Sequence, residues 1–200
     1  MKAVMPVALP DVMALRKRTG ADQWDEIWDG VLHMPPMANW NHQDLEWGME
    51  TFLRLRWAKP NHAKVRHQVN VAPPGGWPDR NYRIPDLILV TAGNFDLNRG
   101  EYFEGAPDVA IEIYSPGDES YDKLDFYAEL GVPAVWIIHR DTKEPEIFVL
   151  KRGRYRKIQP QANGWLRSLA TGIELKKGKP GKLAMQLAGD DSTREDLPED

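Results

Sequence analysis

The chain contains no cysteine among its 200 residues. Disulfide bonds, thiolate metal sites and cysteine nucleophiles are therefore excluded. Long apolar runs are also missing, and the N-terminus lacks the apolar core of a secretory signal peptide. These absences predict a soluble protein of the reducing cytoplasm that does not associate with a membrane.

The chain also lacks an excess of positive charge, since 26 lysines and arginines stand against 30 acidic residues and the formal net charge is -4. Residues 189–200 account for the sign, because they hold six acidic residues against Arg194 alone, and the rest of the chain carries +1. A nearly neutral body can still present a local basic groove, so total charge does not exclude a nucleic-acid partner.

Two hundred residues fit one domain comfortably. We predict a single folded domain over residues 1–175. From Lys176 onward the apolar periodicity is lost, and the end of the chain is acidic and free of aromatic residues. Such composition is typical of disorder, so residues 176–200 are predicted to form a disordered polar tail.

Apolar periodicity predicts a mixture of helices and strands. Helices are expected over 10–18, 41–58 and 120–130, strands over 65–71, 84–90, 109–114 and 134–138, and hairpins over 26–33 and 146–158. Asn39 or Asn41 is expected to cap the long helix. The strand, helix and strand between 109 and 138 predict a βαβ crossover, so the predicted fold class is α/β with a mixed sheet flanked by helices.

Two acidic residues interrupt these apolar strands. Glu112 stands among Val109, Ala110, Ile111 and Ile113. A carboxylate in a buried strand is costly unless a partner stabilises it, so we expect an ion pair with an arginine such as Arg83, a hydrogen-bond network or a metal. Asp86 begins the other strand, where it would either cap a turn or share a site with Glu112.

Carboxylates that point the same way from adjacent strands can share a divalent cation. Their hard oxygen atoms favour Mg²⁺ or Mn²⁺, and the backbone carbonyl of Ile113 could complete the protein's share of the ligands. Lys123 begins the helix after the Glu112 strand, where its ammonium could orient a water or offset charge on a phosphate. Alternatively, Lys123 is a solvated surface charge. Together Asp86, Glu112 and Lys123 form the predicted catalytic group.

The long helix offers a weaker signal, because His42, Glu46 and Glu50 recur every four residues. Either they form a solvated face, or Glu46 is an extra metal ligand beside His42. His62 and His67 do not have the spacing of a closed zinc site. There is no P-loop, no Gly-x-Ser-x-Gly motif and no dinucleotide-binding glycine fingerprint.

A longer pattern resembles a known family. Its segments are Ala106–Pro116, Tyr121–Ala128, Gly131–Pro133 and Val135–Ile138, preceded by Trp28–Leu32, His42 and Pro85-Asp86. Over roughly residues 20–175 the chain is similar to the bacterial Uma-type restriction endonuclease family of the PD-(D/E)XK nuclease superfamily. The resemblance implies a restriction-endonuclease-like core. It also implies that Asp86 and Glu112 are the two motif acids, and that Lys123 replaces the strand lysine whose place Tyr114 occupies. Val31 stands where the family often has glutamate.

The sequence thus predicts a Mg²⁺- or Mn²⁺-dependent nuclease that acts on DNA. Its eight tryptophans could supply the apolar interface of a homodimer. The alternative is a nuclease fold that binds nucleic acid or a protein without cleavage. A plain βα scaffold with surface acids is the third interpretation.

Overall fold

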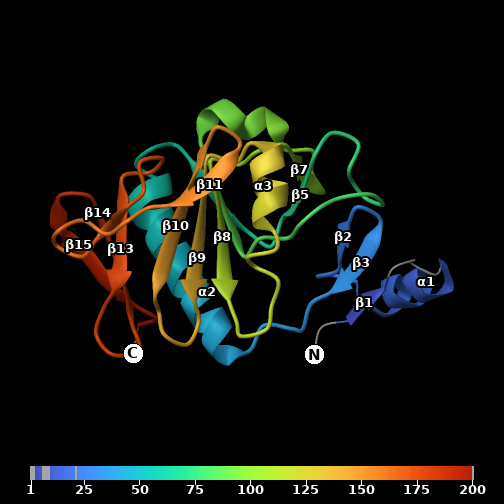
Figure 1. Cartoon of the computed structure of the whole chain (residues 1–200), viewed down its shortest axis with the longest axis horizontal. Coiled ribbons are helices and arrows are strands. Elements are labelled where there is room, and N and C mark those ends of the chain that lie inside the picture. The colour runs from blue at the N-terminus through green and yellow to red at the C-terminus, as the bar shows by residue number, and fades with distance from the viewer. Residues whose placement is uncertain (1–2, 6–9, 21, 200) are drawn as a thin grey trace.

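A six-stranded mixed sheet forms the centre of the molecule in the computed structural model, which describes residues 3–5, 10–20 and 22–199 (Figure 1). The strand order is β11 (Arg154–Lys157), β10 (Pro145–Lys151), β9 (Ala134–His139), β8 (Val109–Tyr114), β6 (Leu87–Val90) and β4 (Lys64–His67). Strands β8 and β9 are parallel, and the other neighbours are antiparallel. This confirms the predicted α/β class and its mixed sheet.

Helices cover the two faces of this sheet. Helix α2 (Trp40–Phe52) continues into a π-helical segment, η1 (Leu53–Ala58), and lies behind the sheet in Figure 1, whereas α3 (Leu124–Leu130) lies in front. Alternate residues of β8 serve the two faces, since Ile111 joins the core beneath α2 and Ala110 joins the core beneath α3. Among the described residues, no helix combines the length and apolarity that crossing a membrane requires.

The ends of these helices follow local chemistry. Asn39 caps α2, because its side chain accepts a hydrogen bond from the backbone N–H of His42 at 3.1 Å. Helix α3 ends at Gly131, whose φ of 87° lies in the left-handed region that glycine tolerates. The helix begins at Leu124, later than predicted, so Lys123 occupies its N-cap position. The parallel pairing of β8 and β9 confirms the βαβ crossover.

Smaller elements from the part of the chain that precedes β8 lie outside the central sheet. They are β1 (Ala3–Met5), α1 (Pro10–Thr19), β2 (Glu26–Trp28), β3 (Val31–Met34), the parallel pair β5 (Asn70–Ala72) and β7 (Tyr102–Glu104), and a 3₁₀ segment, η2 (Ala92–Leu97). The predicted hairpin around Asp29-Gly30 is confirmed as β2 and β3. The single strand predicted over 65–71 is wrong. It divides into β4 and β5 at Gln68, whose φ is 49°.

The predicted disordered tail over 176–200 is also wrong, because its described residues complete a second sheet. Its strands are β12 (Leu166–Arg167), β13 (Ile173–Lys177), β14 (Leu183–Leu187) and β15 (Asp190–Leu197). Leu183, Met185 and Leu197 are buried in the same core as α2. Backbone hydrogen bonds do not depend on side-chain polarity, so the acidic strand β15 pairs with β14 without an apolar pattern of its own.

Candidate active site

The predicted site residues meet at one edge of the central sheet. The carboxyl ends of parallel β8 and β9 lie at this edge, and antiparallel β6 begins there. Leu87 pairs with Ile111, so the preceding Asp86 comes beside Glu112. A cavity of about 390 Å³ opens at this edge, and Asp86, Glu112 and Lys123 all line it. The convergence on which the nuclease prediction depends is therefore present.

Asp86 is held by two donors from different elements. Its Oδ1 lies 2.9 Å from Nε2 of His42 on α2, and its Oδ2 accepts a 2.6 Å hydrogen bond from the backbone N–H of Ile113. Ligand atoms of His42, Glu46 and Asp86 all lie within 4.8 Å of one another. Helix α2 thus contributes two of the three groups that could hold a metal ion.

Glu46 has a buried carboxylate oxygen that could bind a cation. Its side chain is buried, and its Oε1 has no hydrogen-bond partner among the described residues; Nδ1 of His67 lies 3.7 Å away. Burial, with the nearby charge of Asp86, raises the pKa of Glu46 to about 7. A buried acceptor without a donor is costly unless a cation satisfies it. Two carboxylates and one imidazole form a donor set that accommodates Mn²⁺, and also Mg²⁺ with added waters.

The surrounding carboxylates change the pKa of His42. Burial lowers its pKa, but the hydrogen bond and charge of Asp86 and the charges of Glu46 and Glu112 outweigh burial, so the pKa of His42 is raised overall. A bound cation would therefore replace positive charge that the imidazole supplies in its absence.

Glu112 lies on the α3 side of the sheet, in a second buried group. Its Oε2 accepts from the Lys123 ammonium at 3.1 Å, and its Oε1 accepts from the Tyr127 hydroxyl at 2.6 Å. The same ammonium lies 2.8 Å from Oε1 of Glu26 and donates to the carbonyl of Ile84 at 3.3 Å. One cation therefore holds acids from β2 and β8.

The charges of this buried group shift its protonation. Burial raises the pKa of Glu112 to about 8, with contributions from Asp86 and Glu26, while Lys123 opposes the increase. Burial lowers the pKa of Lys123, but the charges of Glu112 and Glu26 outweigh burial and raise it overall. Several negative groups thus share one ammonium, and further positive charge in the cavity would be stabilising.

The sequence did not identify two members of this group, Glu26 and Tyr127. Glu26 lies on the hairpin, and its Oε1 also accepts from the backbone N–H of Ile84 at 2.8 Å. Tyr127 follows Lys123 by four residues, so helical spacing was a usable signal for it. Only the tertiary structure brings Glu26 into reach.

The structure also bears on the interpretations of Arg83, Lys123 and Ile113 that the sequence suggested. Arg83, the suggested structural partner of Glu112, instead lies between the rings of Trp28 and Phe126, 4.2 Å from each centroid, and donates to the carbonyl of Ile27. Lys123 is buried, so the interpretation of a solvated surface charge is wrong. Ile113 contacts Asp86 through its N–H, and a metal contact through its carbonyl stays a prediction. The catalytic roles of Asp86, Glu112 and Lys123 also stay predictions.

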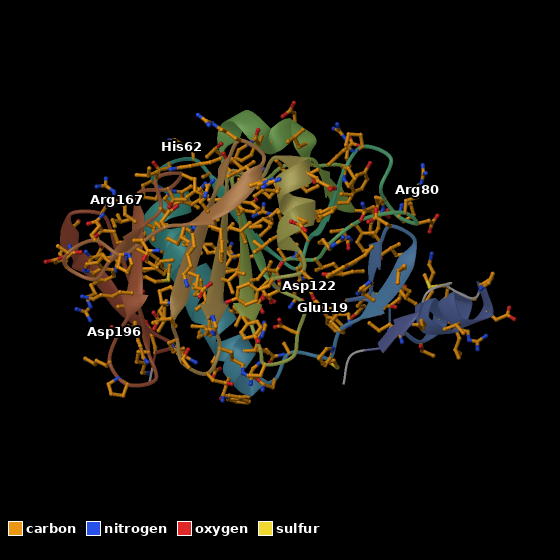
Figure 2. All side chains as sticks on the ribbon, in the orientation of Figure 1. His62, Arg80, Glu119, Asp122, Arg167 and Asp196 are labelled. Carbon is orange, nitrogen blue, oxygen red and sulfur yellow. The ribbon has the colours of Figure 1, made fainter. Side chains whose placement is uncertain are left out.

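The loop between β8 and α3 forms one wall of the cavity. Glu119 and Asp122 lie on this loop, near β3, in Figure 2. The carboxylate of Glu119 lies 3.1 Å from Nδ1 of His33 on β3, which ties the loop to the hairpin that carries Glu26.

This architecture, with acids and a lysine gathered at the edge of a mixed sheet, defines a protein of the restriction-endonuclease-like fold class. Residues 10–183 match the model of the Uma2 family, whose description is "Putative restriction endonuclease", and the chain belongs to this family. It is similar to a crystal structure described as a "putative nuclease belonging to DUF820" from Anabaena variabilis. The TM-score is 0.58 at 15% identity, and the match covers 72% of this chain and 80% of that one. None of the curated proteins matches the chain.

Proposed function

We propose that this protein is a metal-dependent endonuclease that hydrolyses phosphodiester bonds in DNA. The observation that carries the proposal is the shared cavity. It is lined by His42 and Asp86 and by the buried pair of Glu112 and Lys123. Glu46 lies next to it, with ligand atoms of Glu46, His42 and Asp86 within 4.8 Å of one another, and the Oε1 of Glu46 has no hydrogen-bond partner among the described residues. Membership of a nuclease family supports the same class of reaction.

His42, Glu46 and Asp86 would hold Mg²⁺ or Mn²⁺ through imidazole nitrogen and carboxylate oxygen atoms. The cation, when bound, polarises a phosphate and acidifies a water. Glu112, across from Asp86 in the sheet register, lines the same cavity. Its carboxylate is oriented by Lys123 and Tyr127, so it enters the reaction in one fixed geometry.

Lys123 has two functions in this proposal. Its ammonium fixes the carboxylates of Glu26 and Glu112, and its charge offsets the negative charge that develops on the phosphate. The displaced position of this lysine, on a helix rather than on β8, is compatible with both functions. The ammonium reaches the strand acid directly at 3.1 Å.

The test is a cleavage assay on supercoiled, linear and single-stranded DNA with Mg²⁺, Mn²⁺ or EDTA. We expect metal-dependent cleavage by the wild-type protein, and a loss of at least about 100-fold in Asp86→Asn and Glu112→Gln. Glu129→Gln, which changes an exposed glutamate of α3, is the matched control and should retain activity. Absence of cleavage of every DNA form with both metals would refute the proposal.

A second function is favoured by one observation, the acidic lining of the cavity. Glu26, Asp86, Glu112, Asp118 and Glu119 all contribute to it, which disfavours close approach of a phosphate without a metal. A nuclease fold that binds nucleic acid or a protein without cleavage does not need to bring a phosphate into this cavity. Calorimetric titration with Mn²⁺ separates the two, because the enzyme requires binding that Asp86→Asn weakens and the binding module requires none.

A further inference from the structure

The acidic lining of the cavity repels an anionic substrate, so positive charge is required to bind one. Five carboxylate side chains line it, those of Glu26, Asp86, Glu112, Asp118 and Glu119. Among the described residues that line it, the permanently charged cations are Lys123 and Arg140. These two are therefore the residues of the cavity that could hold a phosphate through a permanent positive charge.

Lys123 is already committed to other groups. An ammonium has three N–H donors. Those of Lys123 have three acceptors, Glu26 at 2.8 Å, Glu112 at 3.1 Å and the carbonyl of Ile84 at 3.3 Å. A direct phosphate contact would break one of these bonds inside a buried group, which costs free energy.

Arg140 is placed differently, at the end of β9. Its backbone N–H donates to the carbonyl of Tyr114 at 2.9 Å, so it lies beside the carboxyl end of the Glu112 strand. Its side chain donates to Oγ of Ser115 at 3.2 Å and to both carboxylate oxygens of Asp141, at 2.7 and 3.0 Å.

The partners of Arg140 are exchangeable. The side chain of Asp141 is 50% exposed, so water can replace it as a partner of the guanidinium. These bonds use one N–H of each guanidinium nitrogen, and both terminal nitrogens carry a second N–H. A guanidinium presents these donors in a planar fork that matches two phosphate oxygens.

We propose that Arg140 is the residue that binds a backbone phosphate of the nucleic-acid substrate at the mouth of the cavity. This inference rests on the proposed nuclease function and assigns the substrate contact to the end of β9. Arg140 then contributes to substrate binding more than to the chemical step, in contrast to Glu112 and Lys123.

The test compares Arg140→Gln with Arg167→Gln. Arg167 is exposed on β12, remote from the labelled Glu119 in Figure 2, so both variants remove one positive charge but only one changes the cavity. Steady-state cleavage gives KM and kcat. Fluorescence anisotropy with a labelled oligonucleotide and Ca²⁺ gives affinity as a function of salt. Arg140→Lys keeps the charge without the planar fork, and it replaces the glutamine variant if that variant is unfolded.

We expect Arg140→Gln to raise KM about tenfold with kcat changed less than about threefold. The magnitude of the slope of log affinity against log salt concentration should fall by about one, the value that corresponds to the loss of one phosphate contact. Arg140→Lys should lie between the wild type and Arg140→Gln. A KM and salt slope equal to those of Arg167→Gln would overturn the inference and leave the nuclease proposal intact.

Failure of the nuclease proposal gives a different result, absence of cleavage by the wild-type protein. The anisotropy data then decide about Arg140 separately. Weaker binding in Arg140→Gln than in Arg167→Gln supports the phosphate contact in a non-cleaving protein. Equal binding in the two variants, or no binding by the wild type, overturns it.

Discussion

Replacing Lys123 by methionine should destabilise the protein in a manner that depends on pH. The ammonium lies between the buried carboxylates of Glu26 and Glu112. Methionine fills a similar volume without charge, so the variant leaves these acids without their cation. Removal of one partner from a buried ion pair costs about 3–5 kcal/mol.

The proton uptake of the buried carboxylates leads to the same magnitude. A buried carboxylate that loses its cation avoids the unpaired charge by binding a proton. Each pH unit above an ordinary glutamate pKa of about 4.3 adds about 1.4 kcal/mol to the cost of that protonation. The pKa of Glu112, about 8, already keeps that carboxyl group largely neutral at pH 7.3 in the wild type, so the loss of Lys123 neutralises one further carboxyl group. That step costs about 4 kcal/mol at pH 7.3 and about 1.4 kcal/mol at pH 5.3. The raised folded-state pKa makes the variant's stability fall as pH rises.

Urea unfolding of wild-type and variant proteins at pH 5.3 and 7.3 measures this loss directly. For a domain of this size, 4 kcal/mol corresponds to a decrease in Tm of about 8–16 °C. Lys151→Met, at an exposed position of β10, is the control and should change the free energy of unfolding by less than about 0.5 kcal/mol. Adding Glu26→Gln to Lys123→Met should restore part of the stability.

Two results would refute this reasoning. One is a loss below about 1 kcal/mol in Lys123→Met at pH 7.3, which would mean that the ammonium does not compensate buried charge. The other is an equal loss at both pH values, which would show that packing, and not charge, determines the effect.

Two further predictions concern the metal and the C-terminal sheet. Mn²⁺ at 100 times its Kd should stabilise the wild-type protein by about 2.7 kcal/mol, so Tm measured by scanning calorimetry should rise and EDTA should reverse the increase. Glu46→Gln should abolish most of this increase in Tm. An unchanged response in that variant would contradict the assignment of Glu46 as a ligand. Leu197→Ala should reduce the free energy of unfolding by about 2–5 kcal/mol, because Leu197 is buried against Gly48 of α2. A loss below 1 kcal/mol in urea unfolding would argue that β15 does not complete the core.

The main sheet was largely predictable from the sequence. Strands β8 and β9 are apolar over nearly their whole length, and a strand buried on both faces has this pattern. The capping asparagine of α2 and the terminal glycine of α3 fix the ends of those helices locally. The acidic strand β15 was missed, because its stability comes from pairing with β14 and from Leu197, not from local pattern.

The candidate site was also predictable from the sequence only in part. Glu112 was recognisable because a charged residue in an apolar strand requires a partner, whatever the fold. The complete group around it was not recognisable, because Glu26, which shares the Lys123 ammonium with Glu112, lies on a hairpin 86 residues away in sequence.

The sequence by itself determined the periodicities of the core elements, the family resemblance and the presence of costly buried acids. The tertiary structure alone decided that Glu46 lies beside Asp86, with its Oε1 lacking a hydrogen-bond partner among the described residues. It also decided that Lys123 joins two carboxylates and that Arg140 lines the same cavity as Lys123. The physical reason is range. Helix caps and apolar periodicity act over a few residues, whereas the charges of a site interact through space, between segments that only the folded chain brings together.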